Sequence, residues 1–231
     1  MAKVSLVCLA NSTKLSGRCI AGIRADNGNW VRPVGPGDGT VFRSHYLLSD
    51  GSEPALLDLI SLDLGQPCPL PYQRENHSFG SEAWQLLDRP APSALAPHLR
   101  AATVFGPDLL IGSADRVRVS ELDPSQSADS LALVFPNVLN WYKTQNIRGN
   151  DQIRAVFALG AVEYSLVVTD PLWKARFQTV PMGHHTNADV GLPEGERLLI
   201  TVSLAGPLNG ICYKLVAAVM QLPHEWLSAL S

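Results

Sequence analysis

The 231-residue sequence has few charged residues. Asp, Glu, Lys and Arg together make up 17% of it, and the formal net charge at pH 7 is −3. A typical globular protein has about a quarter of its residues charged. This composition excludes a strongly basic protein that binds nucleic acid through its overall charge. A local basic patch remains open, because net charge does not describe how charges are distributed.

Membrane and catalytic signatures are also missing. No apolar run approaches the ~18 residues that span a bilayer, and Met1-Ala2-Lys3 leads directly into an alternating segment rather than a signal peptide. We therefore expect a cytoplasmic protein without a membrane partner.

No Walker loop, G-x-S-x-G, H-E-x-x-H or G-x-G-x-x-G motif occurs. His184, His185 and Asp189 have no further ligand at a defined spacing, so no metal or other cofactor is expected.

The sequence contains four cysteines, and no two of them have the C-x2-C spacing of a metal site. They are Cys8, Cys19, Cys68 and Cys212. Cys8, Cys19 and Cys212 lie in apolar strand patterns. We expect free, reduced thiols rather than disulfides, metal ligands or catalytic nucleophiles.

Short alternating segments separated by turn residues dominate the chain. Gly and Pro make up about one residue in seven, which suits many short strands. The pattern predicts strands at 3–10, 18–25, 30–34, 57–64, 116–122, 131–135, 152–159, 162–168, 197–204 and 211–220. Asn27-Gly28 predicts a hairpin turn, and Pro33 places its strand at a sheet edge or beside a bulge.

Few segments favour helices. Short helices are expected at 81–87 and 172–177, the second beginning at Thr169-Asp170-Pro171, where Thr or Asp caps and Pro fits the first turn. Residues 89–97 are expected to be the loosest segment of the first half, and 178–196 to form a polar loop.

These segments show no sustained alternation of strand and helix, which argues against a parallel α/β sheet. We predict a mainly β protein with two small barrels of about five strands each, joined near residues 90–110. The first domain would span residues 1–100 and the second residues 101–231. The two barrels are expected to pack as one rigid unit.

A polar turn near the start of the chain is the first candidate site. Asn11, Ser12, Lys14 and Arg18 combine hydroxyl, amide and cationic groups, the chemistry that holds a phosphate or a nucleic-acid backbone. The alternative is a solvated loop whose polar side chains satisfy their own turn.

Trp30 and Arg32 form the second candidate, because residues two apart on a strand share one face. An aromatic ring beside a guanidinium can stack a base and pair with a phosphate. The alternative is a half-buried Trp with an Arg that extends to solvent at a barrel edge.

The loop at 71–76 is the third candidate. Tyr72, Gln73, Glu75 and Asn76 crowd polar groups into it, and loops often carry function. The alternative is a structural cap between the two halves.

Lys214, in the last apolar strand, is a further candidate. It lies either at the solvent-exposed end of that strand or near an anion.

Several motifs, in this order along the chain, resemble the prokaryotic dual OB-containing domain family. They are LANSTKLSGRCIAG, GNWVRPV, LLDLISLDL, YQREN, VVTDPLW and VSLAGPLNGICYKLVAAV, and they extend from about residue 4 to residue 220. The resemblance implies two OB-like β-barrels in tandem and a nucleic-acid or nucleotide-binding role in bacterial defence. The motif positions are Asn11, Ser12, Lys14, Arg18, Trp30, Arg32, Tyr72, Gln73, Glu75, Asn76, Thr169, Asp170, Tyr213 and Lys214.

Three functions compete on this basis. The first is a non-enzymatic module that binds single-stranded nucleic acid or a nucleotide, with backbone contacts from Lys14, Arg18 and Arg32 and stacking on Trp30 and Tyr72. These cations predict a log-log salt slope of about −2. The second is an adaptor for an effector protein. The third is a nucleotide- or nucleic-acid-processing enzyme that uses Glu75 and Asn76 as acid and base. The first function requires Lys14, Arg18, Arg32, Tyr72 and Asn76 to share one cleft.

Overall fold

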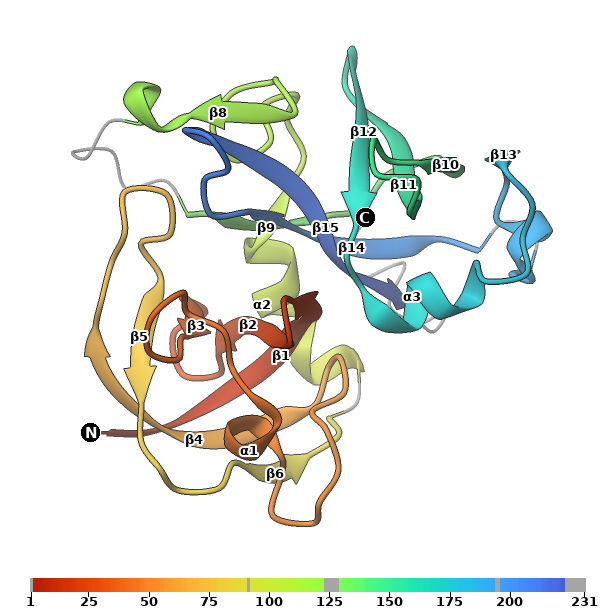
Figure 1. Ribbon diagram of the computed structural model, residues 1–231. Coiled ribbons are helices and arrows are strands. Elements are labelled where there is room, and N and C mark those ends of the chain that lie inside the picture. Colours follow the sequence, from red (N-terminus) through yellow and green to blue (C-terminus); the bar gives the residue numbers. More distant parts are fainter. Residues whose placement is uncertain (1, 91, 123–128, 194–195, 223–231) are drawn as a thin grey trace.

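The computed structural model describes residues 2–90, 92–122, 129–193 and 196–222, and the chain is mainly β (Figure 1). The first half forms one sheet of six strands with a single-turn helix, α1 (Arg43–Tyr46), between the third and fourth strands. The strands are β1 (Ala2–Lys14), β2 (Gly17–Arg24), β3 (Trp30–Pro33), β4 (Leu59–Pro67), β5 (Asn76–Phe79) and β6 (Gln85–Asp88).

The first sheet closes on itself into a barrel. Its strand order is β1-β2-β3-β5-β4-β6, and β1 also pairs with β4. The strand β1 is long enough to serve both neighbours: its first half, 2–7, pairs with β4, and 6–14 pairs with β2. Within this first sheet, β3 and β5 are the one pair of neighbouring strands that run parallel. A closed five-stranded sheet in this order, with β6 added at its side, is an OB-type barrel.

The second half forms a sheet that extends from residue 103 to residue 221. Its strands are β7 (Thr103–Val104), β8 (Arg116–Arg118), β9 (Leu131–Val134), β10 (Leu139–Gln145), β11 (Asp151–Leu159), β12 (Val162–Val168), β13 (Gly183–His185), β14 (Leu198–Leu204) and β15 (Ile211–Gln221). The helical segments are α2 (Pro92–Ala101), α3 (Pro171–Arg176) and the 3-10 turns η1 (Val119–Glu121) and η2 (Ala188–Val190).

The second sheet repeats the strand order of the first with its initial strand split in two. β9 pairs with β14, and β10 pairs with β11. Together β9 and β10 therefore occupy the position that β1 alone occupies in the first barrel. The break falls at 135–138, which contains Pro136, a residue without a backbone donor. β12 and β15 run parallel, as β3 and β5 do, and α3 lies between β12 and β14 as α1 lies between β3 and β4.

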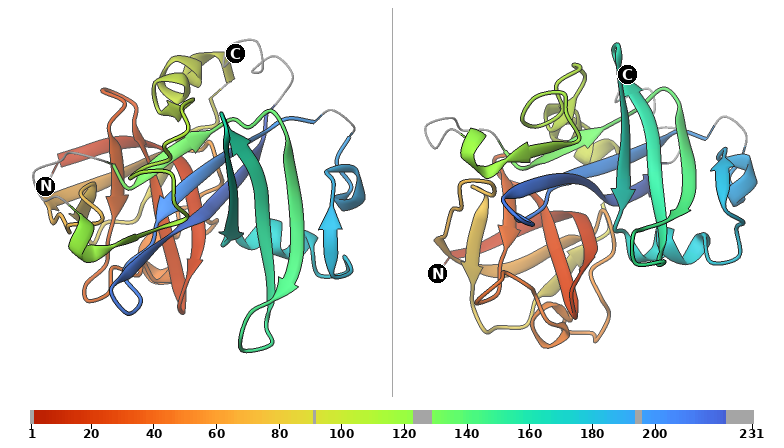
Figure 2. Two further views of the ribbon diagram at one scale, coloured as in Figure 1. Left: turned by 90° about the horizontal axis from the view of Figure 1, so that it is seen from above. Right: turned by 45° about the horizontal axis from the view of Figure 1, so that its top comes forward.

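The two barrels lie side by side, and β1 contacts β15 (Figure 2). Each barrel has its own apolar core, and a third cluster fills the junction. Alternation along the strands explains the division, since successive side chains of a strand point to opposite faces. On β14, Ile200 and Val202 point into the second barrel, whereas Leu199 joins the junction and the hydroxyl of Thr201 donates to the carbonyl oxygen of Leu9 at 2.5 Å.

The junction cluster draws on both barrels and on α2. Its buried members are Val7, Leu9, Ala10, Ala21, Ile23, Trp30, Leu95, Leu99, Leu131, Leu133, Phe135, Leu199, Ala217, Met220 and Leu222. Because neither barrel covers these side chains alone, the two barrels form one packed body.

The expectation of a mainly β chain of short strands is confirmed, including the Asn27-Gly28 turn, where Gly28 has φ +73°. The Asp170 cap of α3 is also confirmed: its side chain accepts from the backbone N–H groups of Leu172 and Trp173. The strands at 76–79 and 139–145 were not expected, and the predicted loop at 178–196 contains β13 and η2.

Three local predictions are wrong. Residues 81–87 form bends and the start of β6 rather than a helix, and most of 89–97 belongs to α2 rather than to a loose segment. Leu95 and Leu99, four residues apart on α2, pack into the junction cluster, and this burial stabilises the helix despite Pro97. β3 is not an edge strand, since it pairs with β2 and β5, so that half of the Pro33 prediction is wrong. The alternative of a nearby bulge agrees with the register shift at 64–67 in β4, because His77 pairs with both Pro33 and Pro67.

Candidate nucleic-acid interface

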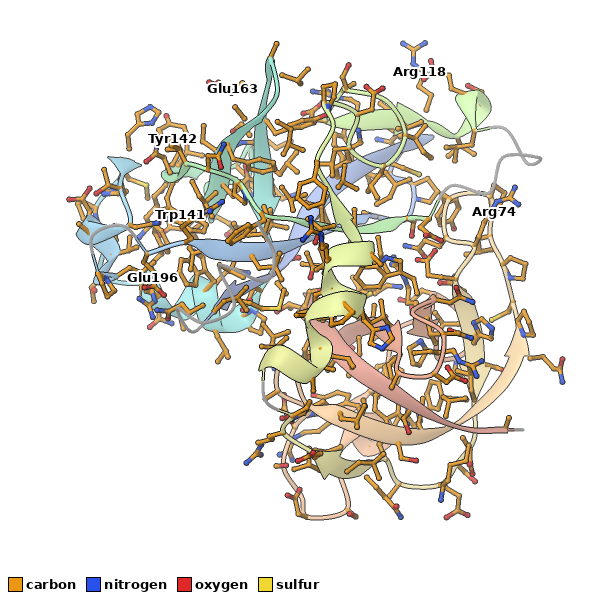
Figure 3. The ribbon with its side chains drawn as sticks, turned by 180° about the vertical axis from the view of Figure 1, so that it is seen from behind. Arg74, Arg118, Trp141, Tyr142, Glu163 and Glu196 are labelled. Atoms are coloured by element: carbon orange, nitrogen blue, oxygen red, sulfur yellow. The ribbon has the colours of Figure 1, made fainter. Side chains whose placement is uncertain are left out.

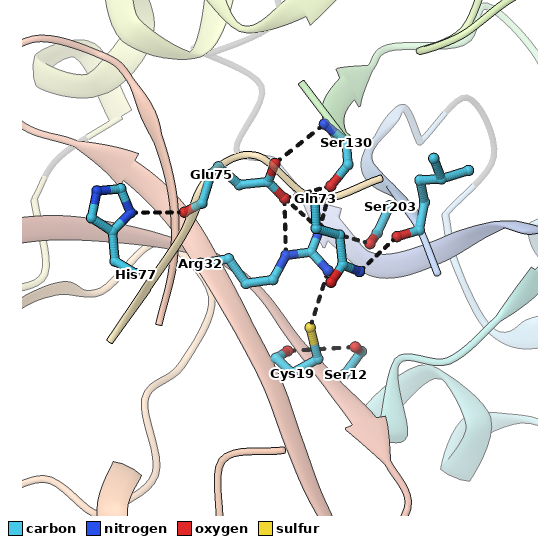
Figure 4. Close-up of polar contacts among 9 residues, drawn as sticks. Ser12, Cys19, Arg32, Gln73, Glu75, His77, Ser130 and Ser203 are labelled. Carbon is cyan, nitrogen blue, oxygen red and sulfur yellow. Dashed lines mark hydrogen bonds and ion pairs between the residues drawn. The ribbon is translucent and has the colours of Figure 1, made fainter. Parts of the chain in front are cut away.

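A buried ion pair lies where the barrels meet (Figure 4). The guanidinium of Arg32, on β3, donates from Nη2 to Glu75 Oε1 at 2.7 Å and from Nε to the same oxygen at 3.0 Å. Both side chains are almost completely buried, at 3% and 2% exposure. Two charges so far from water are stable only when each is compensated by the other and by further hydrogen bonds.

Those further bonds come from the second barrel. Arg32 Nη2 donates to Ser130 Oγ at 2.8 Å and to Ser203 Oγ at 3.3 Å. The hydroxyl and backbone N–H of Ser130 both donate to the Glu75 carboxylate. Gln73 Nε2 donates to the carbonyl oxygen of Leu204 at 2.9 Å. We call Arg32, Gln73, Glu75, Ser130 and Ser203 the inter-barrel clamp.

The clamp corrects the interpretation of Trp30 and Arg32 as an exposed binding pair. Their side chains do share a face of β3, as the spacing predicts, but the second barrel covers that face. Trp30 is 8% exposed and belongs to the junction cluster, so its ring is not free to stack a base. The alternative interpretation of 71–76 as a cap between the halves describes Gln73 and Glu75 well.

The polar turn at 11–18 is also shorter than expected. β1 continues to Lys14 and β2 begins at Gly17, so only Leu15 and Ser16 form the turn. Asn11 Nδ2 donates to the carbonyl oxygen of Pro54 at 2.8 Å, and Ser12 is buried within the strand.

The two cations of this hairpin point to different partners. Arg18 Nη2 pairs with Glu53 Oε2 at 3.2 Å. Lys14 Nζ donates to the carbonyl oxygen of Asp38. The charge of Arg18 is therefore compensated by a carboxylate, whereas Lys14 bonds a neutral carbonyl and lines an open groove.

That groove, which we call the loop groove, has a volume of about 1060 Å³. Its walls are the tip of the β1–β2 hairpin, the loop at 34–39, the β4–β5 loop, β5 and, from the second barrel, Gly206 and Pro207. The β1–β2 and β4–β5 loops are the ones that OB-type barrels use to bind oligonucleotides and oligosaccharides.

The loop groove gathers aromatic, cationic and polar side chains. Tyr72 and Phe79 contribute rings, and Lys14 contributes the charge. Asn76 is 2% exposed, yet its Oδ1 has no hydrogen-bond partner among the described residues; the same holds for Nδ1 of His45. An unpartnered buried acceptor costs about 1–3 kcal/mol, so Asn76 Oδ1 is an unsatisfied group just behind the wall of the groove.

An acidic side chain also lines the groove. Hydrogen bonding from Thr40, whose backbone N–H donates to Asp38 Oδ1 at 2.8 Å, holds the pKa of Asp38 below its ordinary value, assisted by the nearby charge of Lys14. Asp38 therefore remains a carboxylate at neutral pH. It partly offsets the positive charge of Lys14.

Lys214 lies away from the groove, on β15 within the second barrel. It is 2% exposed, and its Nζ donates to the carbonyl oxygens of Gly112 at 2.7 Å and Ile111 at 3.2 Å. Burial lowers the pKa of Lys214 to about 8. The expectation that it lies at the wet end of its strand is wrong; it holds the 111–112 loop against the barrel.

The candidate residues therefore divide into three groups. Lys14, Tyr72, Gln73 and Asn76 line the loop groove. Arg32 and Glu75 lie behind it in the clamp. Asn11, Ser12, Arg18, Trp30 and Lys214 do not line the groove, so the expectation of one cleft holding Lys14, Arg18, Arg32, Tyr72 and Asn76 is met only in part.

The outer strands of the second barrel carry little comparable chemistry. On β10, Tyr142 stacks on His184 of β13 with ring centroids 4.5 Å apart, and Glu163 lies on β12 (Figure 3). Arg154, on β11, donates from Nε to Ser165 Oγ at 2.9 Å. The other cation of these strands, Lys143, is buried and paired with the exposed Asp151, so two cations and two exposed carboxylates give these strands no basic surface.

Sequence reasoning missed two further contributors to the groove, His45 and Phe79, and the two clamp serines. Ser130 directly precedes β9 and Ser203 lies within β14; nothing in the local sequence distinguishes them, and only tertiary pairing brings them to Arg32. Among the described residues, no group of three or more His, Cys, Asp or Glu side chains is arranged to hold a metal ion. No helix in the described ranges is long and apolar enough to cross a membrane.

Strand order and loop placement define a protein with two OB-type barrels in tandem. The dual OB-containing domain family matches residues 4–219, nearly the whole chain, and the protein belongs to this family. No curated protein and no solved structure matches the chain.

Proposed function

We propose that this protein is a non-enzymatic module that binds single-stranded nucleic acid or a nucleotide in the loop groove. The observation that supports this most is the groove itself: it lies at the ligand-binding loops of an OB-type barrel and combines Tyr72, Phe79, Lys14 and the unpartnered Asn76 Oδ1. Rings stack on bases regardless of sequence. In a bacterial defence system, such a module would act as a sensor.

The side chains argue for binding rather than catalysis. Glu75, the candidate base, accepts bonds from both Arg32 and Ser130 and is almost completely buried. Asn76 cannot transfer a proton at neutral pH. The loop groove therefore offers recognition groups, and the clamp gives it a rigid rear wall.

The charge of the groove predicts a weak salt dependence. Arg18 and Arg32 are engaged with carboxylates and do not line the groove, which leaves Lys14 as the lysine or arginine of the groove that can meet a backbone phosphate. One neutralised phosphate on a single strand contributes about 0.7 to the log-log slope. We therefore expect a slope near −0.7, shallower than the −2 that three cations would give.

Fluorescence anisotropy with short labelled DNA and RNA strands tests this proposal. Tyr72→Ala should weaken binding by about 5- to 150-fold, because stacking contributes ~1–3 kcal/mol per base, and Tyr72→Phe should retain most of the affinity. Lys14→Ala should flatten the salt slope. The matched control is Tyr142→Ala on β10, which should bind as the wild type does.

A second candidate function is an adaptor that docks an effector protein. It is favoured by exposed leucines near the groove: Leu15 is 78% exposed, Leu70 39% and Leu208 65%. Leu15 also has φ +46°, a left-handed conformation that is uncommon for leucine. If no DNA, RNA or nucleotide binds at low salt, the nucleic-acid proposal fails and the adaptor is the function to test.

A further inference from the structure

A small cavity lies at the inner end of the loop groove. It has a volume of about 110 Å³ and shares Lys14, Gln73 and Gly206 with the groove wall. Both barrels enclose it: Ser12, Cys19 and Arg32 come from the first, and Thr169, Ser203 and Ala205 are among those from the second. We call it the end cavity. Its volume corresponds to three or four water molecules at about 30 Å³ each.

The cavity contains hydrogen-bonding capacity that the protein does not use fully. A guanidinium carries five N–H groups, two of them on each terminal nitrogen. The Nε and Nη2 groups of Arg32 serve Glu75, Ser130 and Ser203, whereas the acceptor of Nη1 among the described residues is the sulfur of Cys19, at 3.6 Å. Sulfur is a weak acceptor, so Nη1, in a side chain 97% buried, keeps donor capacity for a ligand oxygen.

The charges around the cavity favour an anion. Its charged lining residues are Lys14 and Arg32, and the carboxylate paired with Arg32 is that of Glu75. The charges of Arg32 and Glu75 compensate each other, and the charge of Lys14, partly offset by Asp38, leaves a small positive balance at the entrance. Ser12 and Thr169 add hydroxyl groups to the same wall, although each donates its proton to a backbone carbonyl oxygen, Ser12 to that of Cys19 and Thr169 to that of Val216. A guanidinium is a group that holds phosphate oxygens.

The size of the cavity determines which phosphate can enter. A phosphodiester within a strand carries a sugar on each side, and 110 Å³ has no room for either sugar. A terminal phosphate carries a sugar on one side only, and that sugar can remain in the loop groove.

We propose that the end cavity binds the terminal phosphate of a nucleotide or oligonucleotide whose base lies in the loop groove. This rests on the function proposed for the groove and makes the site one that recognises strand ends or mononucleotides. Arg32 Nη1 would donate to the phosphate oxygens, and Lys14 would lie at the entrance.

Competition anisotropy tests the inference with three forms of one short single strand: 5′-phosphate, 3′-phosphate and unphosphorylated at both ends. We expect one phosphorylated form to bind at least tenfold more tightly than the unphosphorylated strand. Nucleoside monophosphates, as competitors, distinguish a mononucleotide site from a strand-end site. Equal affinity for all three strands would overturn the inference while leaving binding in the groove intact.

A cavity-filling variant keeps the test independent of the clamp, whose loss could unfold the protein. Ala205→Leu places a larger side chain at the cavity wall and should abolish the preference for a terminal phosphate without changing the affinity for the unphosphorylated strand. The matched control is Ala101→Leu in α2, an exposed alanine that lines a different cavity between the barrels. It should retain the preference.

Cys19 provides a readout that does not require strand binding. In a Cys68→Ser background the exposed thiol is removed, Cys8 and Cys212 are buried, and Cys19 remains half-buried beside the cavity. Nucleoside monophosphate should slow its modification by a thiol reagent, and Ala205→Leu should remove this protection. Protection without any strand binding would refute the groove proposal for strands but support the cavity as a mononucleotide phosphate site. Absence of both protection and end preference would overturn the inference.

Discussion

Single residues show how burial changes the chemistry that a sequence suggests. The sequence suggests that Lys214 could bind an anionic ligand. In the structure the second barrel surrounds its side chain, and its ammonium group donates to two carbonyl oxygens. Its pKa of about 8, lowered chiefly by burial, gives stability a specific pH dependence.

Lys214→Met should remove the contribution of this lysine to the pH dependence, so the stability of the variant should rise less between about pH 8 and pH 10 than that of the wild type. Between about pH 8 and pH 10.5 the unfolded chain binds the lysine proton and the folded chain does not, so this residue makes unfolding cost more as pH rises, by at most about 3 kcal/mol. Burial raises the pKa of the Cys8 thiol to about 12, which acts in the opposite direction. Urea unfolding of both proteins from pH 7.5 to 10 isolates Lys214 as their difference. Parallel curves would contradict the assignment.

At the scale of elements, α3 depends on one buried carboxylate. Asp170 accepts from Leu172 N at 2.9 Å and Trp173 N at 3.1 Å, and its other oxygen accepts from Val219 N of β15 at 2.9 Å. Burial raises the pKa of Asp170, while these three amide donors act in the opposite direction. The side chain thus joins the helix start to the strand beside it.

Asp170→Ala should lower the free energy of unfolding by about 2–4 kcal/mol. The loss of a helix cap costs about 1 kcal/mol, and an unpaired buried amide at Val219 costs a further 1–3 kcal/mol. Asp170→Asn, which keeps an acceptor oxygen, should be milder. Urea denaturation of the three proteins provides the comparison, and equal losses for Ala and Asn would show that the acceptor is not what stabilises the helix.

The strands and helices also show how far the sequence alone could predict the structure. Alternation identified most strands, and Asp170-Pro171 identified α3, because these signals are local. Alternation could not identify α2, since Leu95 and Leu99 become an apolar face only once the junction exists to receive them. For the site, the shared face of Trp30 and Arg32 was predictable, but its burial was not. Ser130 lies 98 residues from Arg32, and no local pattern joins them.

For the whole molecule, the clamp and the junction cluster predict cooperative unfolding. Wild-type transitions followed by far-UV circular dichroism and by tryptophan fluorescence should coincide. Two separated wild-type transitions would show that the barrels unfold independently.

Glu75→Gln should lower the free energy of unfolding by about 3–5 kcal/mol, because it leaves the Arg32 charge buried without its partner. The matched control is Asp26→Asn, which removes the exposed partner of Arg24 and should change stability little.

The junction also constrains how the protein is made on the ribosome. The face of the first barrel around Leu9 and Trp30 is covered by side chains from β9, β14 and β15, and the bond between Thr201 and Leu9 joins residues 192 positions apart. The first barrel can therefore close during translation while this apolar face still lacks its cover. Until β15 emerges, the nascent chain presents a surface suited to a chaperone, and stalled or truncated chains would be prone to aggregate.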